Sequence, residues 1–196
     1  MNDDCIHYRL PLKTVNSLDW ARIGGPGRAI LPVIGVFAND DDIAWPGLGL
    51  LSELSGYAHR TGSWSVTAGI QALQEHGLLL KTRCGRRNRY ELTNRATWYG
   101  HSYFPLYKRV IMAGQWANLT MAEKAVFGVL GCKGSIERAR REAEDSFCIG
   151  YVFVWRYALL AGVSRMSFWR GLRGLQSKGW VFMDGEGGYQ CFLEPT

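Results

Sequence analysis

Five cationic side chains lie within nine consecutive residues near the middle of the chain, and no acidic residue lies among them. They are Lys81, Arg83, Arg86, Arg87 and Arg89. Cations gathered on one short segment can neutralise phosphates of a nucleic-acid backbone or enter its minor groove. A solvated hairpin tip is the other interpretation of this pattern. We favour phosphate contact, because the cations cluster on the part of a hairpin that would touch such a backbone.

A second group of cations occurs at helical spacing in the last third of the chain, as Arg165, Arg170 and Arg173. Arginine can pair bidentately with O6 and N7 of guanine, which gives roughly 1–3 kcal/mol of discrimination between bases. An ordinary solvated helix face is the alternative. Ser164, the expected N-cap of this helix, and Ser167 complete the candidate DNA-contacting set in this segment.

The matching segment of the first half carries polar or amphipathic side chains in place of cations. These candidates are Ser63, Trp64, Thr67 and Gln71. Gln71 has the amide that reads adenine, whereas Trp64 could equally pack on the preceding turn. His59 and Arg60 in that turn could reach phosphate.

The sequence offers little for catalysis or metal binding. It contains no P-loop, no G-x-S-x-G and no H-E-x-x-H motif. A nuclease needs a carboxylate cluster, and the acidic run Asp40–Asp42 is expected to be a surface turn. The five cysteines are odd in number and too far apart in sequence for a zinc knuckle. We therefore expect no catalytic residues, no metal and no cofactor.

The candidate residues lie in two halves that repeat one pattern. Ile70–Leu78 (IQALQEHGL) matches Leu172–Trp180 (LRGLQSKGW) at an offset of 102 residues. Three further pairs match: Trp20–Ile23 with Trp116–Leu119, Leu10–Leu12 with Phe104–Leu106, and Gly27–Leu31 with Glu123–Phe127. A repeat of this length fits a small domain rather than a solenoid unit. We predict two domains, at 1–95 and 96–196.

Apolar periodicity and turn residues predict the same elements in each half. For the first half we expect an extended segment at 8–15, helices at 28–38, 48–55 and 63–76, and hairpin strands at 78–82 and 89–93. Pro32 is expected in the first turns of its helix, and Ser63 as an N-cap. Residues 94–105 are expected to form a packed connection.

For the second half we expect helices at 121–132, 135–145, 154–161 and 165–178, and strands at 180–183 and 189–193. Thr120 and Glu123 form a capping-box pattern at the start of the first of these helices. Gly56, Gly77, Gly162 and Gly179 are expected to end helices.

Three helices followed by a hairpin, repeated over residues 28–93 and 121–194, resemble the winged helix-turn-helix superfamily. Tandem winged helices of related sequence resemble the replication initiators of bacterial plasmids and related mobile elements, and Tyr103–Leu130 is similar to such proteins too. The resemblance implies two DNA-binding domains that straddle adjacent major grooves. The fold class expected is mainly α with small β-hairpin wings (α+β), as two tandem winged-helix domains related by internal duplication.

The composition of the chain favours binding to an acidic partner. The net charge is +6, 47% of the 196 residues are hydrophobic, and no apolar run is long enough for a membrane span. The N-terminus lacks the pattern of a signal peptide, so we expect a cytoplasmic protein.

The expected function is sequence-specific binding of double-stranded DNA, as a replication initiator or transcriptional regulator of a plasmid or other mobile element. The alternative is a winged-helix scaffold that binds proteins within a nucleoprotein complex. Acidic residues in the second hairpin, 184–188, favour a protein partner for that half.

Overall fold

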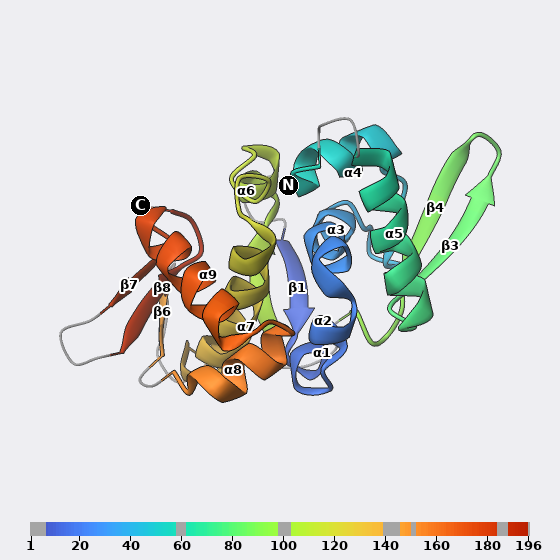
Figure 1. The fold of residues 1–196 in the computed structure, drawn as a ribbon. Coiled ribbons are helices and arrows are strands. Elements are labelled where there is room, and N and C mark those ends of the chain that lie inside the picture. The colour runs from blue at the N-terminus through green and yellow to red at the C-terminus, as the bar shows by residue number, and fades with distance from the viewer. Residues whose placement is uncertain are drawn as a thin grey trace.

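The computed structural model describes residues 7–57, 62–97, 103–138, 146–149, 152–183 and 188–195. It is a mixed α+β fold of helices and small antiparallel sheets, as the sequence predicts. In Figure 1 a central strand pair separates the two halves, and one hairpin projects at each end of the molecule.

The first half begins with a strand and three short or medium helices and ends with a hairpin. Its elements are β1 (His7–Pro11), α1 (Leu12–Asn16), α2 (Asp19–Arg22), α3 (Gly24–Val36), β2 (Ile43–Ala44), α4 (Leu48–Ser55), α5 (Gly62–Glu75), β3 (Leu79–Cys84) and β4 (Arg87–Leu92).

The second half follows the same order, except that no helix corresponds to α2 within its described residues. Its elements are β5 (Tyr103–Tyr107), α6 (Lys108–Met112), α7 (Met121–Arg138), β6 (Ser146–Ile149), α8 (Val154–Ala161), α9 (Arg165–Ser177), β7 (Val181–Met183) and β8 (Tyr189–Phe192).

Each half carries a three-stranded antiparallel sheet with the last strand in the middle. The orders are β2-β4-β3 and β6-β8-β7. In the first sheet Cys84 pairs with Arg87, so the hairpin loop has only two residues, Gly85 and Arg86. Gly85 has φ +60°, which a two-residue hairpin turn of type II′ requires at its first position. The strands are longer and the loop is tighter than the sequence predicts.

A third sheet joins the halves, because β1 pairs with β5 in antiparallel register. Leu10 lies opposite Phe104, and Tyr8 lies opposite Leu106. The sequence match of Leu10 with Phe104 is wrong as a structural equivalence, because the bounds of the strands and of the helices that follow them give a different offset. α1 follows β1 and α6 follows β5 directly, so the residue that corresponds to Leu10 is Leu106.

The hydrophobic core is continuous across the two halves. Trp20 and Trp116, 96 residues apart, are fully buried. The indole N–H of Trp20 donates to the carbonyl of Ala125 in α7 (3.1 Å), and that of Trp116 donates to the carbonyl of Ala29 in α3 (2.9 Å). Each half thus holds a tryptophan from the other. The burial of two tryptophan side chains contributes a large share of the hydrophobic free energy that stabilises a small domain.

Several local predictions are confirmed. α4 and α8 have the expected bounds, and Thr120 and Glu123 form the capping box, with the Thr120 N–H donating to the Glu123 carboxylate at 2.7 Å. The glycines expected to end helices all have positive φ: Gly56, Gly77, Gly162 and Gly179.

Other local predictions are wrong. α1 begins inside the segment 8–15 that we expect to be extended, because Pro11 precedes its first turn instead of interrupting a helix. α3 begins at Gly24, which places Pro32 in the helix interior and Pro26 in the first turn, where a missing N–H is tolerated. α5 begins at Gly62, so Ser63 lies inside the helix and is not its N-cap.

The charged segment and the connection lie partly outside the described residues. α7 continues to Arg138, and the rest of the expected helix at 135–145 lies outside them. In the connection, Ala96 and Thr97 are buried, and so is Phe104 of β5, which packs edge-on against Phe127 with ring centroids 5.1 Å apart. Residues 98–102 are not described. The described part of the connection is packed, as predicted.

Candidate nucleic-acid interface

The exposed face of α5 is held outward by the burial of the opposite face. Val66, Ile70 and Leu73 are buried, as predicted, and α5 packs on α3. Gly69 allows this close approach, because a methyl group there would lie 2.8 Å from the carbonyl oxygen of Pro26. α5 is therefore fixed against the core, and its outward side chains are presented on a rigid element.

The predicted contact residues of α5 lie on this outward face. Trp64 is 76% exposed, and Ser63, Thr67 and Gln71 are exposed as well. The turn on which Trp64 could have packed lies outside the described residues. The Thr67 hydroxyl donates to the Ser63 carbonyl (2.8 Å), and the Gln71 amide donates to the Glu75 carboxylate (2.8 Å). The contact with Glu75 orients the Gln71 amide and uses one of its two N–H groups. His59 and Arg60 lie outside the described residues.

α9 is positioned in the same way. Phe168, Leu172 and Leu175 are buried, and a methyl group at Gly171 would lie 2.8 Å from the carbonyl oxygen of Ala122 in α7. Gly171 follows Gly69 by 102 residues, and Ala122 follows Pro26 by 96, so the same close approach occurs at matching places.

The start of α9 is fixed by its two serines. The Ser164 hydroxyl accepts a hydrogen bond from the Ser167 N–H (3.1 Å) and donates to the Ser167 hydroxyl (3.0 Å). This N-cap leaves Arg165 exposed in the first turn, and Arg170 and Arg173 are exposed further along. Among the residues that the structure describes, none of these arginines forms an ion pair with a carboxylate.

Two exposed residues of α9 were missing from the predicted set. Met166 is 61% exposed, and Trp169 is 41% exposed. Met166 lies four residues before Arg170 and Trp169 lies four residues before Arg173, so each shares part of the outward face with an arginine. The spacing of Trp169 from Arg173 predicts that Trp169 lies on this face. It was not predicted as a contact residue because aromatic residues are usually assigned to a core.

The cations of the first hairpin are distributed over both of its faces. Residues directly opposite each other in an antiparallel pair point to the same face. Lys81 lies opposite the buried Tyr90, so Lys81 and Arg83 share the inner face, whereas Arg87 and Arg89 lie on the outer face. Arg86 lies in the loop between the two strands. The hairpin is cationic around its tip instead of along one side.

The cations of the hairpin are not all equally available. Arg89 forms an ion pair with Glu91 (2.8 Å), two residues along the same strand face, and Lys81 is partly buried. Arg83, Arg86 and Arg87 are exposed. An exposed ion pair such as Arg89–Glu91 contributes only about 0–1 kcal/mol, so a phosphate could displace the carboxylate.

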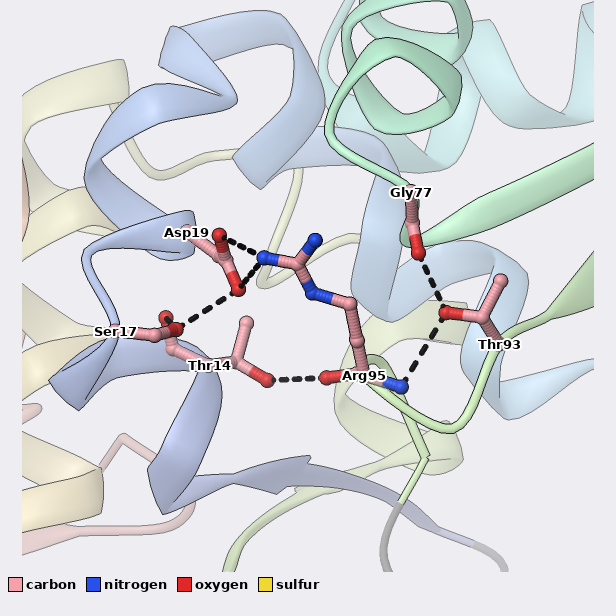
Figure 2. A network of polar contacts seen from close by, with 6 residues as sticks. All are labelled: Thr14, Ser17, Asp19, Gly77, Thr93 and Arg95. Atoms are coloured by element: carbon pink, nitrogen blue, oxygen red, sulfur yellow. Dashed lines mark hydrogen bonds and ion pairs between the residues drawn. The ribbon is translucent and has the colours of Figure 1, made fainter.

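A polar network fixes the base of this hairpin to the first helices (Figure 2). Its members are Thr14, Ser17, Asp19, Gly77, Thr93 and Arg95. The Thr93 hydroxyl donates to the Gly77 carbonyl (2.7 Å) at the end of α5, and the Arg95 guanidinium donates to both carboxylate oxygens of Asp19 (2.6 and 2.7 Å). The buried Asp19 lies at the start of α2, so the end of α5, the end of β4 and α2 form one support.

Two further cations, Arg28 in α3 and Lys124 in α7, are buried at corresponding positions and are therefore not available to a ligand. Arg28 donates to the carbonyls of Gly24 (2.9 Å) and Ala161, and burial lowers its pKa to about 10. Lys124 donates to the carbonyl of Leu119, and burial lowers its pKa to about 7. Both cations satisfy carbonyl oxygens near helix ends.

The second hairpin differs from the first. Phe182 and Met183 on β7 are 45% and 63% exposed, and the acidic tip at 184–187 lies outside the described residues. Two residues of α8, Trp155 and Leu159, are each 59% exposed. The second half therefore combines a cationic helix face with exposed apolar side chains.

No three His, Cys, Asp or Glu side chains gather into a metal-binding group within the described ranges. The helices described there are also too short or too polar to cross a membrane. No protein-family model matches the chain, and no curated protein or solved structure matches it either.

Proposed function

We propose that this chain is a sequence-specific double-stranded DNA-binding protein made of two winged-helix domains, at 1–95 and 96–196. In this proposal α5 and α9 lie in the major groove, and the β3–β4 hairpin contacts the phosphate backbone. The observation that carries the proposal is the outward face of α9, where Arg170 and Arg173 stand exposed on a helix fixed to the core.

The arrangement of elements supports the winged-helix part of the proposal. α3, β2, α4, α5 and the β3–β4 hairpin follow one another, and β2 adds to the hairpin as a third strand beside β4. α7, β6, α8, α9 and the β7–β8 hairpin have the same order and the same strand pairing. In proteins of this plan the last helix before the hairpin enters the major groove.

Charge supports DNA as the partner. The cations of α9 and of the first hairpin lie on exposed elements, whereas Arg28 and Lys124 are buried among carbonyl groups. A net charge of +6 adds a long-range attraction to polyanions. We propose a role in replication initiation or transcriptional control of a plasmid or other mobile element, which mapping of the bound DNA at origins and promoters would test.

The test separates phosphate contacts from base contacts. Arg86→Ala with Arg87→Ala should weaken binding to all duplexes alike and flatten the dependence of log affinity on log salt by about 0.9 per lost contact. Arg170→Ala with Arg173→Ala should weaken binding to the preferred sequence by roughly 1–3 kcal/mol per contact and affect random DNA much less. Fluorescence anisotropy at several salt concentrations measures both effects.

A matched control removes two exposed arginines that lie outside these elements, Arg22 on α2 and Arg109 on α6. Arg22→Ala with Arg109→Ala should change affinity less than either of the other double variants. Binding that does not depend on salt, or no binding at low salt, would contradict the proposal.

A protein-binding role for the second half is the second candidate function. Exposed Trp155, Leu159, Phe182 and Met183 favour it, because large apolar side chains on a surface often mark protein contacts. Footprinting distinguishes the candidates. Two protected groove segments about one helical turn apart support DNA contact by both halves, whereas a single segment assigns the second half to a protein partner.

A further inference from the structure

The register of β1 with β5 defines how the two halves are related in space. Corresponding residues lie 96 apart, so Tyr8 corresponds to Phe104 and Leu10 to Leu106. Tyr8 pairs with Leu106, and Leu10 pairs with Phe104. If each residue is replaced by its counterpart in the other half, the first of these pairs becomes the second and the second becomes the first. Arg9 pairs with its own counterpart, Pro105. An antiparallel pair with this property has a two-fold axis through the Arg9–Pro105 pair.

The same two-fold axis relates the helices of the two halves. The bond from Trp20 to the Ala125 carbonyl becomes the bond from Trp116 to the Ala29 carbonyl when corresponding residues are exchanged. In Figure 1 the matching elements lie on opposite sides of β1, with α4 above and α8 below, and with α5 to the right and α9 to the left. The contact between the halves therefore has the form of an isologous dimer interface within one chain.

A two-fold axis places α5 and α9 at the same height along it and relates one helix to the other by a half-turn, so the directions of the two helices across the axis are opposite. Two DNA-reading helices related in this way can contact one duplex equivalently when the two-fold axis of the duplex coincides with that of the protein. Their half-sites then run in opposite directions, as in operators bound by symmetric dimers.

The two readers carry different side chains at matching outward positions, which are 102 residues apart. The pairs are Trp64 with Met166, Thr67 with Trp169, Ala68 with Arg170, and Gln71 with Arg173. A glutamine amide pairs with adenine, whereas arginine pairs with guanine. A dimer of identical chains cannot make this distinction, because both of its helices present the same residues.

We propose that the chain binds a duplex with two unlike half-sites in inverted orientation, a site containing adenine under α5 and a site containing guanine under α9. This inference rests on the proposed function. It adds the relative orientation of the half-sites and assigns a base preference to each helix.

Exchanging the outward residues tests the proposal. The variant Trp64→Met, Thr67→Trp, Ala68→Arg and Gln71→Arg gives α5 these four outward side chains of α9. Repeated selection from a random duplex library should enrich unlike inverted half-sites with the natural chain, and a palindrome of the guanine-containing half-site with this variant. The natural chain should prefer its own site over that palindrome by roughly tenfold or more.

The reciprocal variant is the matched control. Met166→Trp, Trp169→Thr, Arg170→Ala and Arg173→Gln should enrich a palindrome of the adenine-containing half-site. If the fourfold change in α5 disturbs the helix content seen by circular dichroism, Gln71→Arg alone should still replace adenine by guanine in one half-site only.

The outcomes separate this inference from the proposed function. If the exchanged variants enrich direct repeats, the inverted orientation is wrong and DNA binding stands. If the enriched half-sites do not change with the side chains, the assignment of α5 and α9 as base readers is wrong. If the natural chain enriches no sequence, the proposed function itself fails.

Discussion

Replacing Trp20 by phenylalanine should destabilise the whole molecule, although the substitution lies in the first half. Trp20 is fully buried, and its N–H donates to Ala125 in α7. The smaller ring removes about 40 Å² of buried apolar area, which corresponds to about 1 kcal/mol at ~25 cal/mol per Å². The lost hydrogen bond adds about 1 kcal/mol, and the space left behind adds a little more. We expect the free energy of unfolding to fall by about 2–3 kcal/mol.

Urea denaturation followed by circular dichroism and by fluorescence measures this loss. With a slope of roughly 2–3 kcal/mol per molar urea, the midpoint should move down by about 1 M. Both signals should still fall in one transition, because the lost contact belongs to both halves. Trp64→Phe is the control, since Trp64 is 76% exposed and its replacement should change stability by less than about 0.5 kcal/mol.

Two separate transitions in the Trp20→Phe variant, with the second half unaffected, would refute this reasoning. So would a change no larger than that of the control. Trp20→Phe combined with Trp116→Phe should deviate from additivity, because both indoles pack in the same interface.

Three further predictions concern buried polar groups. Burial lowers the Lys124 pKa to about 7, below the value of 10.5 for a free lysine, so the folded chain binds fewer protons than the unfolded chain between these pH values. The free energy of unfolding should therefore rise with pH across this window, and Lys124→Met should flatten the rise in urea titrations at several pH values. Gly174→Ala places a methyl group against the buried Glu123 carboxylate and should cost about 1–3 kcal/mol in urea denaturation. Arg95→Ala removes the guanidinium from the buried Asp19 carboxylate; since Arg95 is half exposed, we expect a loss of about 1–3 kcal/mol by thermal unfolding.

Each of these predictions has a control or an outcome that would contradict it. Gly49→Ala in α4 meets no atom within 4 Å, so it should stabilise the helix by about 0.5–1 kcal/mol, opposite in sign to Gly174→Ala. A rise of stability with pH that persists in Lys124→Met would assign the effect to another group. An unchanged melting temperature in Arg95→Ala would mean that Ser17, which donates to the Asp19 carboxylate (2.8 Å), is sufficient for that carboxylate.

The features that sequence patterns predicted well are local. α4 and α8, the left-handed glycines and the Thr120–Glu123 capping box depend on residues within a few positions of one another. The outward placement of Gln71, Arg170 and Arg173 also followed from helical spacing, because burial of one face of a helix determines the other.

The features that sequence patterns missed depend on distant partners. The pairing of β1 with β5 and the exchange of Trp20 and Trp116 join residues that no local pattern relates. The assignment of the hairpin cations to the inner and outer faces required the strand register and the burial of Tyr90. The start of α3 at Gly24 was missed because the glycines around Pro26 indicate a turn when taken alone.

The exchange of tryptophans also has a consequence during synthesis on the ribosome. Ala125 follows Trp20 by 105 residues. At a translation rate of roughly 5–20 residues per second, Ala125 is therefore synthesised about 5–20 s after Trp20, and the indole N–H lacks its acceptor during that time. β1 has no strand partner until β5 emerges. During that interval the first half exposes a large apolar side chain and an open strand edge, features that chaperones recognise and that promote aggregation. The first half is therefore translated first and can complete its core only after much of the second half has emerged.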